Sequence, residues 1–488
     1  MNRREFINSA GLLAAAGAAA PLLSSCSGSG VIRKEDVRDS YSTELLVVGG
    51  GPAGVCAAVA AARMGVKVML VEHGNCLGGM GTRGLVSPFM TCFDGDGEQM
   101  VIRGLFEEVV DRMVAMGGAI HPKDVRHTSP YSAWITAGHD HCTPFEAEAM
   151  KFVMDRMCAE AGVKLLFHAD FVKPLTKGDA LCGAVLLTKK GLEAVSAAVV
   201  IDCTGDGDVA FRAGVPTSFG NPETGGVQPS TMFFSICNVD SKALEADVQK
   251  HLHEFRKVNG VSYRALHWRV AEAEAAGEWD IARKSVNIYK KVKDDEWAVN
   301  CTRLKAVDST DSESLTDGEI EGRRQVWEMM NFFHKYVPGC KDAKLMSTAS
   351  TLGIRESRHV EGVKTLVAED LVNCVTPEDS ILVASNSVDV HGKGGSNATQ
   401  YTTINGKWYG VPFGTLVPVG VKGLLVAGRC LSATSDAAGA VRVMPPVMAM
   451  GHAAGVAAAL ALRGGVMPDA LDVCDIRKEL LAQKAFLG

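Results

Sequence analysis

The sequence predicts an α/β protein in which a Rossmann-like domain, assembled from discontinuous segments, carries an inserted α+β domain. An apolar run at residues 44–48 leads into a glycine-rich turn and then into an Ala- and Val-rich segment. A second apolar run follows and ends in Glu72, whereas residues 216–410 lack this pattern. Strand, turn, helix and strand in this order are typical of a βαβ unit that binds a dinucleotide.

The glycine-rich turn fills the pattern G-x-G-x-x-G with Gly49, Gly51 and Gly54. The first glycine permits the tight turn, the second lets a pyrophosphate approach the backbone, and the third lets helix and strand pack closely. We expect a helix over residues 53–64. Its N-terminal N–H groups and its dipole would face the phosphates.

The acid that closes the second strand completes the motif. Residues 66–71 are the predicted strand, and Glu72 lies 23 residues after Gly49. A carboxylate at this point accepts hydrogen bonds from ribose hydroxyls and disfavours a 2′-phosphate. The motif therefore predicts dinucleotide binding, but it does not separate NAD from FAD.

Three later segments favour FAD. Residues 78–86 look like the loop that follows the ribose acid in glutathione-reductase-like flavoproteins. Residues 199–208 resemble the strand-turn that those proteins place near the cofactor, with Cys203 where Ala is usual. Residues 423–429 resemble their C-terminal strand, whose end meets the ribityl chain and the flavin.

Together with residues 353–359 and 409–418, these segments resemble the bacterial FAD-dependent oxidoreductase family, distant kin of fumarate reductase flavoproteins. The resemblance covers roughly residues 43–465. It implies FAD as the cofactor, and it adds further cofactor contacts to Gly49, Gly51, Gly54 and Glu72. The added contacts are Gly79, Thr82, Val172 (through its backbone, near the adenine), Thr204, Gly205, Asp206, Gly428 and Arg429. Covalent attachment of the flavin, for which His73 is the one candidate, is left open.

The resemblance and the break in pattern set the expected domain boundaries. We expect the FAD-binding domain to comprise residues 43–215, with an insertion at 86–142, and residues 411–465. The substrate or cap domain is expected at residues 216–410, and a C-terminal tail at residues 466–488.

The sequence pattern also predicts strands at residues 163–172, 181–187, 192–201 and 231–236 and helices at residues 143–161, 241–257, 316–336 and 447–462. Thr143 to Glu146 should form a capping box with Pro144 in the first helical turn. Residues 385–400 are expected to be a loop. In the resembled family the helix at 447–462 directs its N-terminus at the flavin.

The first residues resemble an export signal. Arg3-Arg4 is similar to a twin-arginine motif, and the apolar stretch from Ala10 to Leu23 is too short to span a bilayer. Cys26 completes a sequence that resembles a lipobox, so residues 1–25 would be removed and residues 26–42 would be a tether. We expect an exported, lipid-anchored protein of the periplasm or cell surface. The alternative is a disordered or helical N-terminal extension.

Composition excludes several other functions. A net charge of −6 without basic blocks argues against nucleic-acid binding. The 14 cysteines include no Cys-x-x-Cys, which argues against iron–sulfur clusters and zinc ribbons. Cys76 and Cys92 are too far apart for the Cys-x4-Cys of disulfide reductases. Residues 139–142 (His-Asp-His-Cys) hold metal-ligand types, but we expect a loop or helix cap there and no metal.

The best candidates for catalysis are Arg355, Arg358 and His359. Two guanidinium groups could clamp a carboxylate or alkoxide while the imidazole acts as acid or base. The alternative is a set of salt bridges at the domain interface. Arg429 and Arg442 flank the flavin-facing segment, and we expect at least one of them to contact cofactor or substrate.

Three functional hypotheses follow. The first is an FAD-dependent dehydrogenase of a small polar, sugar-like or hydroxylated substrate, with hydride transfer to flavin N5. Because nicotinamide cofactors are scarce outside the cytoplasm, its electrons would pass to a quinone or a redox protein. The second is a reductase of an activated alkene carboxylate, as in the fumarate reductase kin. The third is a non-catalytic surface binding protein that retains a flavin.

Overall fold

A computed structural model describes residues 36–135, 138–392 and 399–488. The predicted export signal, residues 1–25, and the lipidation site Cys26 lie outside the described residues. From residue 39 to the C-terminus the chain packs as one unit.

The predicted Rossmann-like sheet is confirmed, and its parallel strands lie in the order β21-β8-β2-β3-β4. These strands are β2 (Leu45–Val48), β3 (Val68–Glu72), β4 (Lys164–Phe167), β8 (Val199–Asp202) and β21 (Leu424–Val426). Every residue of β2, β3 and β8 is buried, as required of parallel strands that are covered on both faces. Because the strands run parallel, their carboxyl ends share one edge, where ligands bind in sheets of this type.

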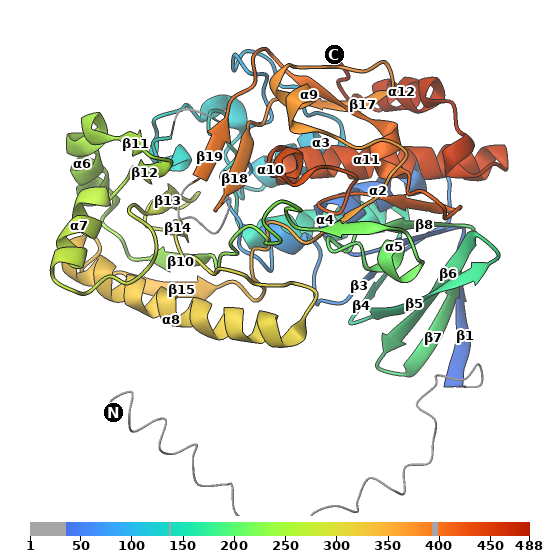
Figure 1. The fold of residues 1–488 in the computed structure, drawn as a ribbon, viewed down its shortest axis with the longest axis horizontal. Coiled ribbons are helices and arrows are strands. Elements are labelled where there is room, and N and C mark those ends of the chain that lie inside the picture. Colours follow the sequence, from blue (N-terminus) through green and yellow to red (C-terminus); the bar gives the residue numbers. More distant parts are fainter. Residues whose placement is uncertain (1–35, 136–137, 393–398) are drawn as a thin grey trace, which may run out of the picture. The chain divides into compact units, whose positions relative to one another are not determined.

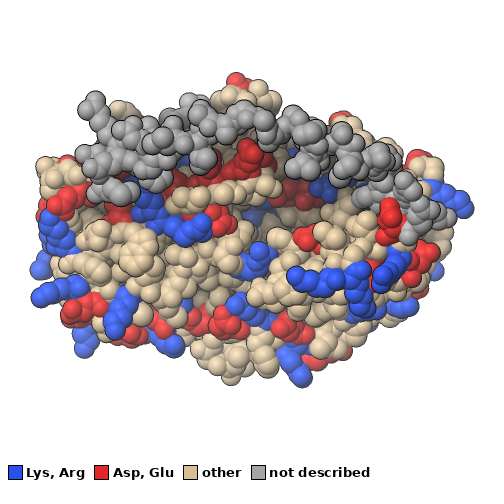
Figure 2. All heavy atoms as spheres, turned by 90° about the horizontal axis from the view of Figure 1, so that it is seen from below, with Lys and Arg blue, Asp and Glu red and all other residues tan. Residues whose placement is uncertain are grey.

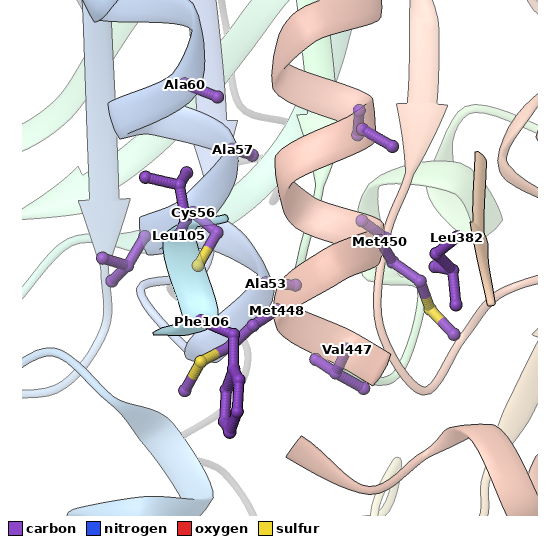
Figure 3. Packing of buried hydrophobic residues seen from close by; sticks show 14 of the residues in the cluster. Ala53, Cys56, Ala57, Ala60, Leu105, Phe106, Leu382, Val447, Met448 and Met450 are labelled. Carbon is purple, nitrogen blue, oxygen red and sulfur yellow. The ribbon is translucent and has the colours of Figure 1, made fainter. Parts of the chain in front are cut away.

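Two helices that are far apart in the sequence cover this sheet together. Helix α2 (Pro52–Arg63) follows β2 directly, and α11 (Met444–Gly464) comes near the end of the chain. A Cβ atom on Gly451 or Gly455 of α11 would overlap the backbone of α2. Figure 3 shows the alanines of α2 turned toward α11, with larger side chains around the contact. The close approach therefore joins the last part of the domain to its first part.

By length and composition α11 could cross a membrane, but most of its residues are buried inside the protein. Its burial makes it a core helix of the nucleotide-binding domain. The other helices of this domain are α3 (Leu105–Ala115), α4 (Ala147–Ala161), α5 (Asp208–Arg212), α9 (Ala368–Val372), α10 (Ser435–Val441) and α12 (Val473–Ala482).

The predicted capping box at the start of α4 is wrong. The helix begins at Ala147, and its N-cap Glu146 makes no side-chain capping bond. Thr143 instead pairs with Phe89 in an isolated antiparallel bridge, where each residue donates its N–H to the other's carbonyl oxygen. The backbone is therefore extended at Thr143 and cannot turn into a helix there.

A second sheet has the order β1-β7-β6-β5. Its strands are β1 (Val37–Ser42), β5 (Asp170–Lys177), β6 (Ala180–Thr188) and β7 (Gly191–Ser196). The strands predicted at residues 163–172 and 192–201 are each divided between this sheet and the parallel sheet. His168, with φ +55°, separates β4 from β5. Ala197 N donates to Cys182 O, whereas Val199 already belongs to β8. One segment therefore serves two sheets at each of these places.

A separate core consists of Trp134 and of residues between Met232 and Leu352, and we call the segment from Met232 to Leu352 the cap. Its sheet has the order β13-β14-β10-β15, and α8 contacts β15 (Figure 1). The cap elements are β10 (Phe234–Cys237), α6 (Ser241–His251), β11 (Arg256–Val258), β12 (Val261–Tyr263), α7 (His267–Ala275), β13 (Asn287–Lys290), β14 (Trp297–Asn300), α8 (Ser312–Tyr336) and β15 (Lys344–Thr348).

The cap ends before residue 410, where we expected its boundary. Residues from Leu366 onward, including β17, belong to the core of the nucleotide-binding domain. The expected loop at 385–400 is wrong in part, because β18 pairs with β19 in an antiparallel hairpin beside α10 (Figure 1). The remaining strands are β9 (Thr217–Phe219), β16 (Arg358–Val360), β17 (Ser380–Ala384), β18 (Val388–His391), β19 (Thr399–Thr402) and β20 (Tyr409–Pro412).

We expect Gly455→Ala to lower the free energy of unfolding by about 1–3 kcal/mol, the usual cost of overpacking. The added Cβ atom would overlap the carbonyl oxygen of Ala57. The matched control is Gly464→Ala in the same helix, where the nearest atom would be 3.7 Å from the new Cβ. Urea unfolding of the two purified variants gives the comparison. A stability loss of the same size in both would contradict the proposed contact.

Candidate active site

The glycine-rich turn has the backbone geometry that a bound pyrophosphate needs. Gly49 has φ +102°, and a Cβ atom on it would overlap Cys203 O. A Cβ atom on Gly54 would overlap Gly49 O, which fixes the close contact of turn and helix. A Cβ atom on Gly51 would meet nothing within 4 Å. The turn is thus closed on its protein side and open at Gly51, which lines a large cavity.

Glu72 is held at the edge of the same cavity. Gly50 N and Gly74 N each donate to one of its carboxylate oxygens at 2.7 Å. Arg83 Nη1 lies 3.4 Å from Oε1 and 2.7 Å from His73 Nε2. The carboxylate is buried and keeps acceptor capacity toward the cavity. This arrangement fits the ribose of a dinucleotide.

The turn after β8 is shaped by Asp202, a residue that the sequence did not single out as functional. Its buried carboxylate accepts from the N–H and hydroxyl of Thr204 at 3.0 and 2.7 Å. It also accepts from the N–H groups of Val209 and Ala210 at 2.9 Å. These bonds place Thr204, with Gly205 beside it, on the cavity wall.

Asp206 and Arg429, both predicted as cofactor contacts, form an ion pair on the cavity wall. Arg429 Nη2 lies 2.8 Å from Asp206 Oδ1, and its Nη1 donates to Ser357 Oγ. Ser309 of the cap donates to the same Asp206 oxygen at 2.7 Å. Although burial opposes ionisation, Arg429 and the hydroxyl donors lower the pKa of Asp206. The ion pair ties the segment after β21 to the turn after β8.

The remaining predicted cofactor contacts lie in different places. Gly79 and Gly428 line the cavity. The hydroxyl of Thr82 is buried and donates to Leu77 O at 2.7 Å, so it is turned toward its own loop. Val172 O accepts from Arg212 Nη1 at 2.7 Å, and the cavity is lined at this point by residues 169–171.

The cavity has a volume of about 1090 Å³ and extends from the glycine-rich turn to residues of the cap and of the β18–β19 hairpin. We call its cap and hairpin portion the chamber. The open Gly51 and the fixed Glu72 carboxylate fit FAD along the turn, as the sequence predicts. The chamber then lies in the same cavity as the cofactor site, where a substrate would be held.

The three predicted catalytic residues are not brought together. Arg355 lines the chamber and donates to Pro229 O and, at 2.8 Å, to Thr231 Oγ1. Arg358 pairs with Asp208 Oδ1 at 3.0 Å and lies over the ring of Phe211. Its pairing is a salt bridge, as the alternative proposed, but both residues lie outside the cap, so the bridge does not cross the domain interface.

His359 is buried, with Nε2 3.5 Å from Glu356 Oε1. The two groups are neighbours along one short segment, and Glu356 also accepts from Gln228 N at 3.0 Å. The contacts of His359 are therefore those of a packed side chain, and the predicted clamp of Arg355 with Arg358 is not formed.

Asp389 and His391, which the sequence reading missed, face the chamber from β18. His391 Nε2 lies 3.1 Å from Asp389 Oδ2. Val388 and Val390 of the same strand are buried in the core. Alternation along a strand sends the acid and the imidazole to the opposite face. The pattern Val-Asp-Val-His was the available signal, hidden by the glycine-rich residues that follow it.

The charges around this pair set its ionisation. Burial and the guanidinium groups of Arg355 and Arg442 lower the pKa of His391 to about 3, against the effect of Asp389. Burial alone would raise the pKa of Asp389, but His391, Arg442 and Arg355 lower it. At neutral pH the pair is therefore an ionised carboxylate beside a neutral imidazole. Arg442, which the sequence placed near the flavin, donates from Nη2 to Asp389 O at 3.3 Å.

The curated digoxin reductase of Eggerthella lenta is 32% identical over 93 residues, which are 16% of this chain and 17% of that protein. The chain thus spans about a sixth of the length of the curated relative that it matches.

Solved structures match most of the chain at low identity and low TM-score. A geranylgeranyl bacteriochlorophyll reductase-like protein from Thermoplasma acidophilum is 13% identical with a TM-score of 0.42, and the match covers 92% of this chain and 84% of that one. L-proline dehydrogenase from P. horikoshii is 11% identical with a TM-score of 0.41, over 91% and 99% of the two chains.

The family described as FAD dependent oxidoreductase matches residues 44–480. This match spans the glycine-rich turn, the cap and α11. The chain therefore belongs to the FAD-dependent oxidoreductase family, and it is an enzyme whose cofactor is FAD.

Proposed function

We propose that this FAD-dependent oxidoreductase dehydrogenates a small polar, hydroxylated substrate bound in the chamber. The observation that carries the proposal is the pair of Asp389 and His391, which lines the same cavity as the glycine-rich turn. FAD, when bound along that turn, supplies the two-electron oxidising chemistry. The chain's own residues bind and orient the substrate and hold the proton that oxidation releases.

The proton acceptor in this proposal is Asp389. Oxidation of a carbon that carries a hydroxyl group releases the hydroxyl proton, and an ionised carboxylate in the chamber can take it. The N–H at Nε2 of the neutral His391 donates to this carboxylate and orients it. Because the carboxylate can only accept, the proton of the neutral imidazole is on Nε2, and Nδ1, 3.0 Å from Thr399 Oγ1, accepts from that hydroxyl. His391 is thus a positioning residue.

Reduction of an activated alkene carboxylate is the second candidate. It is favoured by Arg355, whose buried guanidinium lines the chamber, and a partial relative is named a reductase. That reaction needs a proton donor near the substrate. The ionised Asp389 is a poor donor, and Arg358 is paired with Asp208. We therefore place dehydrogenation first.

The proposal includes export and a non-nicotinamide electron acceptor, either a quinone or a redox protein. Its support is the resemblance of Arg3-Arg4 to a twin-arginine motif and of the segment ending at Cys26 to a lipobox. Outside the cytoplasm nicotinamide cofactors are scarce, so electrons taken from the substrate need another acceptor.

We expect Asp389→Asn to slow substrate oxidation by about 10²-fold, the lower end of the usual contribution of a general base, because a carboxylate with a lowered pKa is a weak base. Anaerobic bleaching of the flavin absorbance by a panel of sugars and hydroxylated compounds measures the rate. Because the pKa of Asp389 is lowered, the rate of the unsubstituted enzyme should hold across neutral pH and fall only in strong acid. The matched control is Asp179→Asn, a surface acid that pairs with Lys422.

Two results would count against dehydrogenation. One is a panel in which no compound bleaches the flavin; the other is an Asp389→Asn variant that is as fast as the unsubstituted enzyme. If chemically reduced enzyme is instead reoxidised by alkene carboxylates, the second candidate takes its place.

Export is tested by localisation in the native host. Replacing Arg3 and Arg4 by lysines should retain the protein in the cytoplasm, whereas Cys26→Ala should release it from the membrane fraction. Cys474→Ala, at an exposed cysteine, is the control and should not alter fractionation. Unchanged membrane association of the Cys26→Ala variant would exclude the lipid anchor.

A further inference from the structure

We infer that the substrate carries at least one carboxylate, bound by a cluster of arginines in the chamber. This inference rests on the proposed function only in taking the chamber as the substrate site. Three of the arginines come from separate segments of the cap, one lies just before β16 and one at the end of α10, and all of them line the same cavity. They are Arg264, Arg283, Arg303, Arg355 and Arg442.

The guanidinium groups of this cluster are not paired with acids. Among the described residues, no carboxylate oxygen lies within 4.0 Å of any of them, although the rest of the protein holds many such pairs. Arg355 donates to a carbonyl and a hydroxyl oxygen. Nε and Nη2 of Arg303 and Nε of Arg442 are buried and have no hydrogen-bond partner within the described part of the chain.

Such a cluster is unfavourable without a ligand. Burial and the neighbouring Arg442, Arg303 and Arg283 lower the pKa of Arg355 well below its ordinary value. Burial, with Arg283, lowers the pKa of Arg303 to about 10. Asp389 is an acid of the chamber whose negative charge acts on Arg264, Arg303 and Arg355 and partly opposes this lowering. Buried like charges without partners cost free energy that an oxyanion would offset.

The chemistry of the ligand follows from the donors. Guanidinium groups bind carboxylates through two parallel N–H···O bonds, and the unpartnered donors of Arg303 and Arg442 are available for this. A neutral polyol would leave the positive charge unbalanced. The face shown in Figure 2 has basic and acidic side chains interspersed, whereas the five arginines of the cluster line one chamber. The inferred substrate is therefore a small hydroxylated carboxylic acid.

The test uses the full-length, FAD-loaded protein, so that the phosphates of the cofactor already occupy their own site. Binding of glucuronate, succinate and inorganic phosphate is measured by calorimetry and by the shift in melting temperature at constant ionic strength. Glucose is the neutral comparator. We expect a carboxylate to bind and to raise the melting temperature, and glucose to do neither.

Arg303→Gln and Arg283→Gln should each weaken carboxylate binding by about 10-fold or more, as for the loss of hydrogen bonds to a charged group. Both variants should fold, because each removes one of several mutually repelling charges. The matched control is Arg323→Gln on the exposed face of α8, where Arg323 pairs with Glu319 at 2.9 Å; it should bind like the unsubstituted protein.

The inference is overturned if the carboxylates bind no better than glucose, if both chamber variants bind as the unsubstituted protein does, or if phosphate binds more tightly than every carboxylate. Results that contradict the proposed function differ from those that contradict this inference. Carboxylate binding without flavin bleaching would retain this inference and remove dehydrogenation. Oxidation of neutral sugars at equal rates in Arg303→Gln would retain dehydrogenation and remove this inference.

Discussion

The contact between α2 and α11 is the constraint on which the rest of the structure depends. It joins a helix that begins at Pro52 to one that begins at Met444, and it works only because the facing residues are Gly or Ala. Through it, the end of β21 and the first turn of α11 reach the cavity lined by the glycine-rich turn. The cap lies in the sequence between these segments, so the closure of the two helices also brings the cap to the cofactor site.

The carboxylates around the cofactor site and the arginines of the chamber differ in how far their hydrogen bonds are satisfied. The carboxylates of Glu72, Asp202 and Asp206 are satisfied by N–H groups, hydroxyls or Arg429, and they hold the turns that surround the cofactor site. In the chamber, Arg303 and Arg442 keep unpartnered donors. A carboxylate that already has its partners fixes the backbone, whereas a cation without a partner is free to bind a ligand. The cofactor side is therefore built for rigidity and the cap side for recognition.

The sequence predicted the features that depend on neighbouring residues. The turn from Gly49 to Gly54, the strand that ends in Glu72 and the long apolar helix near the C-terminus are each encoded within a single stretch of chain. Pairing across the chain was not predictable in the same way. The β18 strand exists because residues 388–391 pair with residues 399–402, and its flanking glycines indicated a loop.

The predicted grouping of Arg355 with Arg358 was wrong for a related reason. Arg355 and Arg358 are close in sequence, but Arg358 starts β16 and points to Asp208, whereas Arg355 lies before the strand and faces the chamber. Arg264, Arg283 and Arg303 have no motif in common, and the cap sheet and its loops bring them to one cavity. A search for clustered residues in sequence therefore selects the wrong partner and misses the right ones.

Cofactor, proton acceptor and anion site come from different parts of the chain, and this separates their roles. Asp389 stands on a strand whose valines belong to the core of the nucleotide-binding domain, so its position follows that domain. Most of the arginines belong to the cap, which Ser309 ties to the nucleotide side through Asp206. Changes in the cap loops can thus alter which substrate is held without moving the groups that hold FAD or accept the proton. The proposed function therefore assigns the redox chemistry to the domain core and substrate choice to the cap.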